Sequence, residues 1–117
     1  DYMAKYRRSR INDAVAAECA VIVREIKDPR VSDVFITVTG ADVTADLKYA
    51  KIFYSVMGEH DERELRAGLK HAAAFVRSRL AEELNLRQTP EISFVLDESV
   101  ARGAHIAELL RDIEEQK

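Results

Sequence analysis

Four basic side chains between residues 61 and 80 recur at a spacing that gathers them on one side of a helix. At 100° per residue they fall within about 60° of one another, roughly a right angle from an apolar stripe of leucine and valine. These residues are Arg63, Arg66, Lys70 and Arg77. A basic ridge of this kind neutralises phosphates, although every helix exposes some charged face and Glu62 or Glu64 could balance its first turn. We give the two interpretations equal weight.

Other basic residues extend the candidate phosphate-binding set. Residues 3–10 contain four basic side chains and no acidic one, namely Lys5, Arg7, Arg8 and Arg10. This density of unopposed charge favours binding over a solvated chain end. Lys27 and Arg30 flank an Asp-Pro turn, where turn chemistry explains them equally well. Arg79 and Arg87 lie off the ridge on the wheel, and a break in the helix would reorient them.

The net charge of -3 argues against a polyanion partner only when it is averaged over the chain. Residues 1–90 contain 15 basic and 14 acidic side chains, whereas residues 91–117 contain 3 and 7. The acidic excess is therefore confined to the C-terminal part, and the rest of the chain remains compatible with nucleic acid.

Catalytic and metal-binding constellations are weak. Asp42 and Asp46 straddle a predicted hairpin turn, where aspartate is common, although a nuclease acting on precursor RNA could use such a pair. Cys19 falls on an apolar helix face and suits a core. The three histidines lack the spacing of zinc ligands: His60, His71 and His105. We expect no enzyme, no metal, no cofactor, no small-molecule substrate and no membrane span, and we expect a monomer in the cytoplasm.

The elements that must position these residues follow from hydrophobic periodicity. Ser9 can cap a helix that ends near Asp28, because Pro29 disfavours helix at the residue before it. Alternating β-branched residues predict a strand over about 33–43, paired as a hairpin with a second strand that ends at Gly58. A third strand follows Pro90, and apolar residues between 106 and 113 suggest a short terminal helix.

Apolar residues at spacings of three or four make the segment 61–86 helical. Because this run is long for a small domain and contains three consecutive alanines, we expect two helices that meet at a kink around Ala72, Ala73 and Ala74. The predicted order is α-β-β-α-(kink)-α-β, with helices covering one face of a three-stranded sheet. This is an α+β fold with the connectivity of a type II KH domain.

Four stretches of the sequence resemble the ribosome-binding factor A family. They are 24–30 (REIKDPR), 46–52 (DLKYAKI), 75–78 (FVRS) and 90–94 (PEISF), and they keep the order and approximate spacing of that family. The resemblance covers nearly the whole chain. It implies a KH-like protein that binds the small (30S) ribosomal subunit, assists processing and maturation of its 16S RNA, and matters most in the cold.

The family carries an Ala-x-Gly kink between its central helices, where ordinary KH domains clamp nucleic acid with a Gly-x-x-Gly loop. The matching triplet here ends in Ala74 instead of glycine, and alanine is about 1 kcal/mol more favourable than glycine inside a helix. The break should therefore be stiffer and shallower. We expect one domain over 1–117, with 1–8 a flexible basic N-terminus and 99–117 a C-terminal tail with a helix.

The predicted RNA-binding set joins the basic residues with the alanine triplet. Its members are Lys5, Arg7, Arg8, Arg10, Lys27, Arg30, Arg63, Arg66, Lys70, Ala72, Ala73, Ala74, Arg77, Arg79 and Arg87. An alternative function is a protein-interaction module that docks through the acidic C-terminal helix around Leu109 and Leu110.

Overall fold

The computed structural model describes residues 2–99, and describes side chains from residue 8 onward. The predicted terminal helix lies outside these residues. The elements, in chain order, are α1 (Tyr2–Ile22), the 3-10 turn η1 (Val23–Glu25), α2 (Pro29–Ser32), β1 (Phe35–Val43), β2 (Tyr49–Met57), α3 (Glu62–Glu83) and β3 (Glu91–Leu96). No helix in the described part of the chain is long and apolar enough to cross a membrane.

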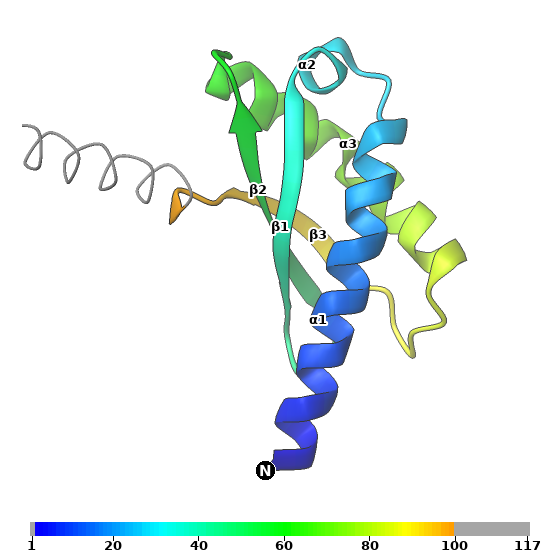
Figure 1. The fold of residues 1–117 in the computed structure, drawn as a ribbon. Helices are drawn as coiled ribbons and strands as arrows, with labels where there is room; N and C mark the ends of the chain where they lie inside the picture. Colours follow the sequence, from blue (N-terminus) through cyan, green and yellow to red (C-terminus); the bar gives the residue numbers. More distant parts are fainter. Residues whose placement is uncertain (1, 100–117) are drawn as a thin grey trace, which may run out of the picture.

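The three strands form one sheet in the order β1-β2-β3 (Figure 1). β1 and β2 are the predicted antiparallel hairpin, with one register shift between Val38 and Gly40. β3 pairs parallel to β2, and α3 supplies the crossover that a parallel connection requires. The sheet therefore has β1 and β3 as its edges, with β2 between them.

One face of the sheet carries the core. Along β2, Ala50, Ile52 and Tyr54 are buried, whereas Tyr49 and Lys51 at alternate positions are exposed. Helical stripes meet this buried face: Val15, Cys19 and Ile22 from α1, and Leu65, Leu69, Val76 and Leu80 from α3. The predicted α+β, KH-like architecture with helices on one face is confirmed.

The first helix differs from its predicted limits at both ends. It begins at Tyr2, so Ser9 lies inside it and the predicted cap at that residue is wrong. Residues 2–8 are helical in backbone, because neither proline nor glycine interrupts them; their flexibility stays a prediction. At the other end α1 passes into η1, and Asp28 instead caps the short α2, accepting a hydrogen bond from the Arg30 N–H at 3.0 Å.

The predicted division of this segment into two helices is wrong. α3 is one uninterrupted helix of 22 residues that runs through Ala72, Ala73 and Ala74. Alanine is the best helix former, and the triplet lacks the glycine, proline or inserted side chain that ordinarily bends a helix. The break that the resemblance implied at this triplet is therefore absent from the helix.

Candidate nucleic-acid interface

The basic ridge predicted on the wheel exists as a side of α3. Asp61 caps the helix by accepting hydrogen bonds from the N–H groups of Arg63 and Glu64 at 3.1 and 3.2 Å. Buried Leu65 and Leu69 then fix the rotation of the helix about its axis. The four ridge residues, Arg63, Arg66, Lys70 and Arg77, are all exposed.

The ridge residues differ in how their charge is used within the molecule. Arg66 donates to Glu62 one turn earlier at 3.3 Å. Arg77 donates two hydrogen bonds to the Thr89 carbonyl oxygen at 3.2 and 3.0 Å and so holds the loop before β3. The side chains of Arg63 and Lys70 make no hydrogen bond or ion pair with any described residue. These two cations are the ones available to an external anion.

A groove of about 370 Å³ lies between the ridge and the edge strand β3. Arg66 and Lys70 stand on its rim. Its floor is mostly apolar and includes Phe94, whose ring meets that of Tyr54 edge to face at 6.4 Å. Cations on the rim and an aromatic floor together suit a nucleotide, which presents both a phosphate and a flat base.

Glu62 ties the start of α3 to the sheet beside this groove. It accepts hydrogen bonds from the Tyr54 hydroxyl at 2.6 Å and from the His60 Nε2 at 2.5 Å, in addition to that from Arg66. Burial opposes ionisation of Glu62, but these three donors outweigh it and lower the pKa of the carboxyl. The hydrogen bond to Glu62 in turn raises the pKa of His60.

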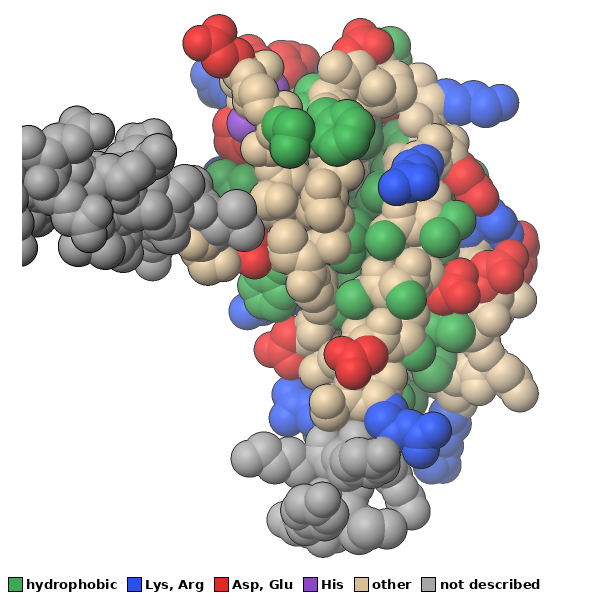
Figure 2. Space-filling model, in the orientation of Figure 1, with side chains coloured by type: hydrophobic (Ala, Val, Ile, Leu, Met, Phe, Trp, Pro, Cys, Tyr) green, Lys and Arg blue, Asp and Glu red, His purple; other side chains and the backbone are tan. Residues whose placement is uncertain are grey.

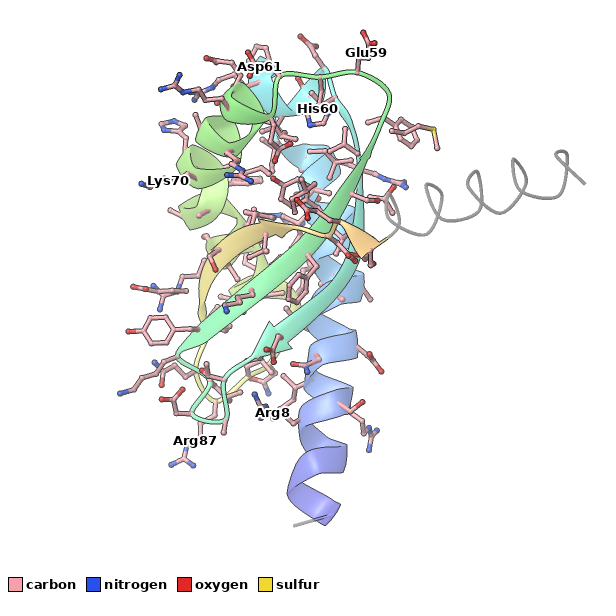
Figure 3. The ribbon with its side chains drawn as sticks, turned by 90° about the vertical axis from the view of Figure 1, so that its left-hand side faces the viewer. Arg8, Glu59, His60, Asp61, Lys70 and Arg87 are labelled. Atoms are coloured by element: carbon pink, nitrogen blue, oxygen red, sulfur yellow. The ribbon has the colours of Figure 1, made fainter. Side chains whose placement is uncertain are left out.

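A second basic group lies at the hairpin end of the molecule. Arg8 donates to the Val43 carbonyl oxygen at 3.1 Å, which brings the first turns of α1 to the end of β1. Arg87 lies at the same end as Arg8, and Lys and Arg side chains flank this end of the surface (Figures 2 and 3). Lys48 in the hairpin turn is also exposed. Its carbonyl oxygen accepts a hydrogen bond from the N–H of Glu91 at the start of β3, so the turn lies beside the loop that carries Arg87. We call Arg8, Lys48 and Arg87 the basic end.

Two aspartates of this end have structural partners. Asp42 lies 3.5 Å from the Arg8 guanidinium. Asp46 accepts from the Thr44 hydroxyl at 2.7 Å and from the Lys48 N–H at 3.1 Å, and these hydrogen bonds lower the pKa of its carboxyl. Such contacts are typical of turn aspartates. Among residues 2–99, the structure groups no three His, Cys, Asp or Glu side chains that could hold a metal ion.

Acidic residues mark the opposite end. Glu59, His60 and Asp61 lie in the β2–α3 connection, far from Arg8 and Arg87 along the long direction of the molecule, and Lys70 lies on α3 between the two ends (Figure 3). The two ends of the molecule therefore differ in charge. The ridge begins near the acidic end and runs along α3 away from it.

Three of the predicted site residues, Lys27, Arg30 and Arg79, belong neither to the ridge nor to the basic end. Arg30 makes a two-pronged contact with Asp28, at 3.1 and 2.7 Å, which lowers the pKa of that carboxyl to about 2. Arg79 contacts three carboxylates, those of Glu25, Glu82 and Glu83. Lys27 beside them is exposed and has no partner among the described residues. These ion pairs favour a structural role for the two arginines and leave Lys27 as the available cation.

The remaining predicted residues are distributed over the two helices. Arg10 is exposed on α1, and the side chains of Lys5 and Arg7 lie outside those that the structure describes. Ala72 is buried, Ala73 partly buried and Ala74 exposed, so the triplet spans the boundary between core and solvent. The predicted set omitted Phe75 and also Lys48, which could have been recognised from its position in a hairpin turn.

Comparison with known proteins gives one consistent result. The sequence profile described as "Ribosome-binding factor A" matches residues 7–110. Proteins named ribosome-binding factor A from Clostridium botulinum and Clostridium novyi are 45% and 43% identical to this chain, over 98% of it and 97% and 96% of their own lengths.

Solved structures agree on the fold. A solution structure of a Thermotoga maritima protein, described as a candidate ribosome binding factor A, covers 80% of this chain and 90% of its own length, with a TM-score of 0.69 and 27% identity. The crystal structure of the Thermus thermophilus ribosome-binding factor A covers 76% and 94%, with a TM-score of 0.65 and 21% identity. A homology model of the Thermus thermophilus ribosome-binding factor A, fitted into a cryo-EM map of its complex with 30S, covers 74% and 91%, with a TM-score of 0.61 and 18% identity.

Proposed function

This chain belongs to the ribosome-binding factor A family, and we propose on that premise that it binds the small ribosomal subunit through its 16S RNA. The observation that carries the proposal is a pair of cations on the ridge beside an apolar groove, Arg63 and Lys70, whose side chains have no partner among the residues that the structure describes. A fold neighbour fitted into a 30S complex supports the same partner.

The proposed mechanism is positioning. Phosphate contacts from the ridge and from the basic end supply affinity without reading sequence, and the folded shape of the RNA supplies specificity. The aspartates near the basic end are occupied in turn and helix contacts, and the relatives are named as binding factors. Binding alone therefore accounts for the activity that we propose.

The family resemblance carries the finer part of the proposal. We propose that binding assists processing and maturation of the 16S RNA in the cytoplasm, and that the need for it is greatest in the cold, where misfolded RNA helices rearrange slowly. The rigid crossover helix of this chain suits a protein that holds RNA in one arrangement.

The proposal is tested by reversing the charges of Arg63 and Lys70. The double variant R63E/K70E should lose co-sedimentation with purified small subunits, because it replaces two phosphate contacts by repulsion, and its circular dichroism should be unchanged. Lys51→Glu, an exposed lysine on the open face of the sheet, is the matched control and should sediment as the unmodified protein does. Equal sedimentation of the double variant and the control would rule out the ridge.

A further inference from the structure

A second and larger groove lies on the other side of α3 from the ridge. It encloses about 860 Å³ between the segment Glu25–Asp28 and the α3 residues His71, Ala72, Phe75 and Arg79. The short helix α2 follows that segment and packs against α3 so closely that a Cβ on Gly68 would come within 2.8 Å of Val31. The groove therefore has walls fixed by a tight helix contact.

The floor of this groove is apolar. Ile26 and Ala72 are buried, and Phe75 keeps 42% of its surface exposed although it borders a cavity. Burial of a phenylalanine ring is strongly favourable, so a half-exposed ring at the edge of a concave surface is a site for a flat apolar group.

The charges around the groove leave one cation unmatched. Of the two carboxylates in its lining, Glu25 lies 2.8 Å from the Arg79 guanidinium and Asp28 lies 2.7 Å from that of Arg30. Lys27 stands between them in sequence, is exposed, and has no partner among the described residues. An occupant that is both flat and anionic matches this combination.

We propose that the groove holds one unpaired nucleobase of RNA, stacked on Phe75, with an adjoining phosphate at Lys27. The inference rests on the proposed function and adds a subsite to it. A base within a regular duplex is unavailable to such a groove, whereas bases of single strands, bulges and loops stack readily on aromatic side chains. An aliphatic side chain of a partner protein would fill the floor but would leave Lys27 without a counter-charge.

The experiment uses the full chain with two RNA probes of equal length. One is an unstructured single strand carrying 2-aminopurine at its centre, and the other is a blunt duplex. Phe75→Leu removes the aromatic face but keeps an apolar side chain, and Phe75→Trp restores an aromatic ring. Tyr49→Leu is the matched control, since Tyr49 is 56% exposed and lies on the open face of the sheet.

The expected result is selective. Phe75→Leu should weaken single-strand binding about ten-fold, the size of one lost stacking contact, and abolish quenching of 2-aminopurine. Phe75→Trp should retain both, Tyr49→Leu should change neither, and duplex binding should be equal in all four proteins. An abasic site at the probe's centre should weaken the unmodified protein as much as Phe75→Leu does.

Two outcomes would overturn the inference. Single-strand binding and quenching by Phe75→Leu that equal those of the unmodified protein would show that the groove holds no base. Normal RNA binding by Phe75→Leu combined with lost binding to small subunits would assign the groove to a protein side chain. If the unmodified protein bound neither RNA probe nor small subunits, the proposed function itself would fail, which is a distinguishable result.

Discussion

The ion pair between His60 and Glu62 makes the stability of this fold depend on pH near neutrality. The imidazole Nε2 lies 2.5 Å from the carboxylate, and both side chains are largely shielded from solvent. The hydrogen bond to Glu62 raises the pKa of His60 in the folded protein above the ordinary value of 6.5. The pair therefore stabilises the folded state fully below pH 6.5, and this contribution is lost as pH rises through the raised pKa.

We predict that the free energy of unfolding falls between pH 6.5 and 9 more steeply in the unmodified protein than in His60→Gln. The glutamine keeps a donor for Glu62 but does not titrate. Urea unfolding followed by circular dichroism at each pH gives the difference between the two proteins. A difference that stays constant across the range would contradict the assignment of this dependence to His60.

The sequence could predict site residues whose arrangement is local, but not those whose contacts join distant segments. The ridge depends only on positions within one helix, so a helical wheel predicted it. The contact of Arg79 with Glu25 joins residues 54 positions apart, and no local pattern reveals it. Phe75 was missed for a similar reason, because its groove exists only where the segment after α1 packs beside α3.

At the scale of elements, α3 is where the structure differs from what the resemblance implied. The strands, the hairpin and the helical layers were predictable because hydrophobic period and β-branched residues report burial directly. The start of α1 could not be predicted, because a serine that can cap a helix can also lie inside one. The expected break in α3 was wrong, because what the resemblance implied for a triplet with glycine does not apply to a triplet of alanines.

Two opposite substitutions in α3 separate intrinsic helix propensity from packing. Propensity alone predicts that Gly68→Ala stabilises the protein and Ala74→Gly destabilises it, each by about 1 kcal/mol. Packing changes the first expectation, because the new Cβ would lie 2.8 Å from Val31 and 2.9 Å from the Arg30 Cβ. Overpacking of this kind costs about 1–3 kcal/mol.

We therefore predict that both variants lower the free energy of unfolding, Gly68→Ala by up to about 2 kcal/mol after its gain in propensity, and Ala74→Gly by about 1 kcal/mol. Chemical denaturation measures both. Ala74→Gly should also speed amide exchange in the middle of α3, since it restores a flexible position there. A more stable Gly68→Ala would show that α2 and α3 are farther apart than the structure places them.

At the scale of the whole molecule, several of the cations that we propose to bind RNA are not needed for the stability of the fold. The buried face of the sheet and the contacts of Arg8 and Asn12 with the backbone of Val43 hold α1 in place. Arg63 and Lys70 on the ridge and Arg87 at the basic end have no partner among the described side chains, and they lie on surfaces that the core does not need. Their charges can therefore be removed one at a time without unfolding the protein.

The salt dependence of affinity for purified small ribosomal subunits tests the central claim most directly. We predict that log Kd rises linearly with log salt concentration, and that Lys70→Gln lowers the slope by about one, the contribution of a single phosphate contact. Lys51→Gln should leave the slope unchanged. Affinity that is independent of salt, or a slope that Lys70→Gln does not alter, would contradict RNA binding through the ridge of α3.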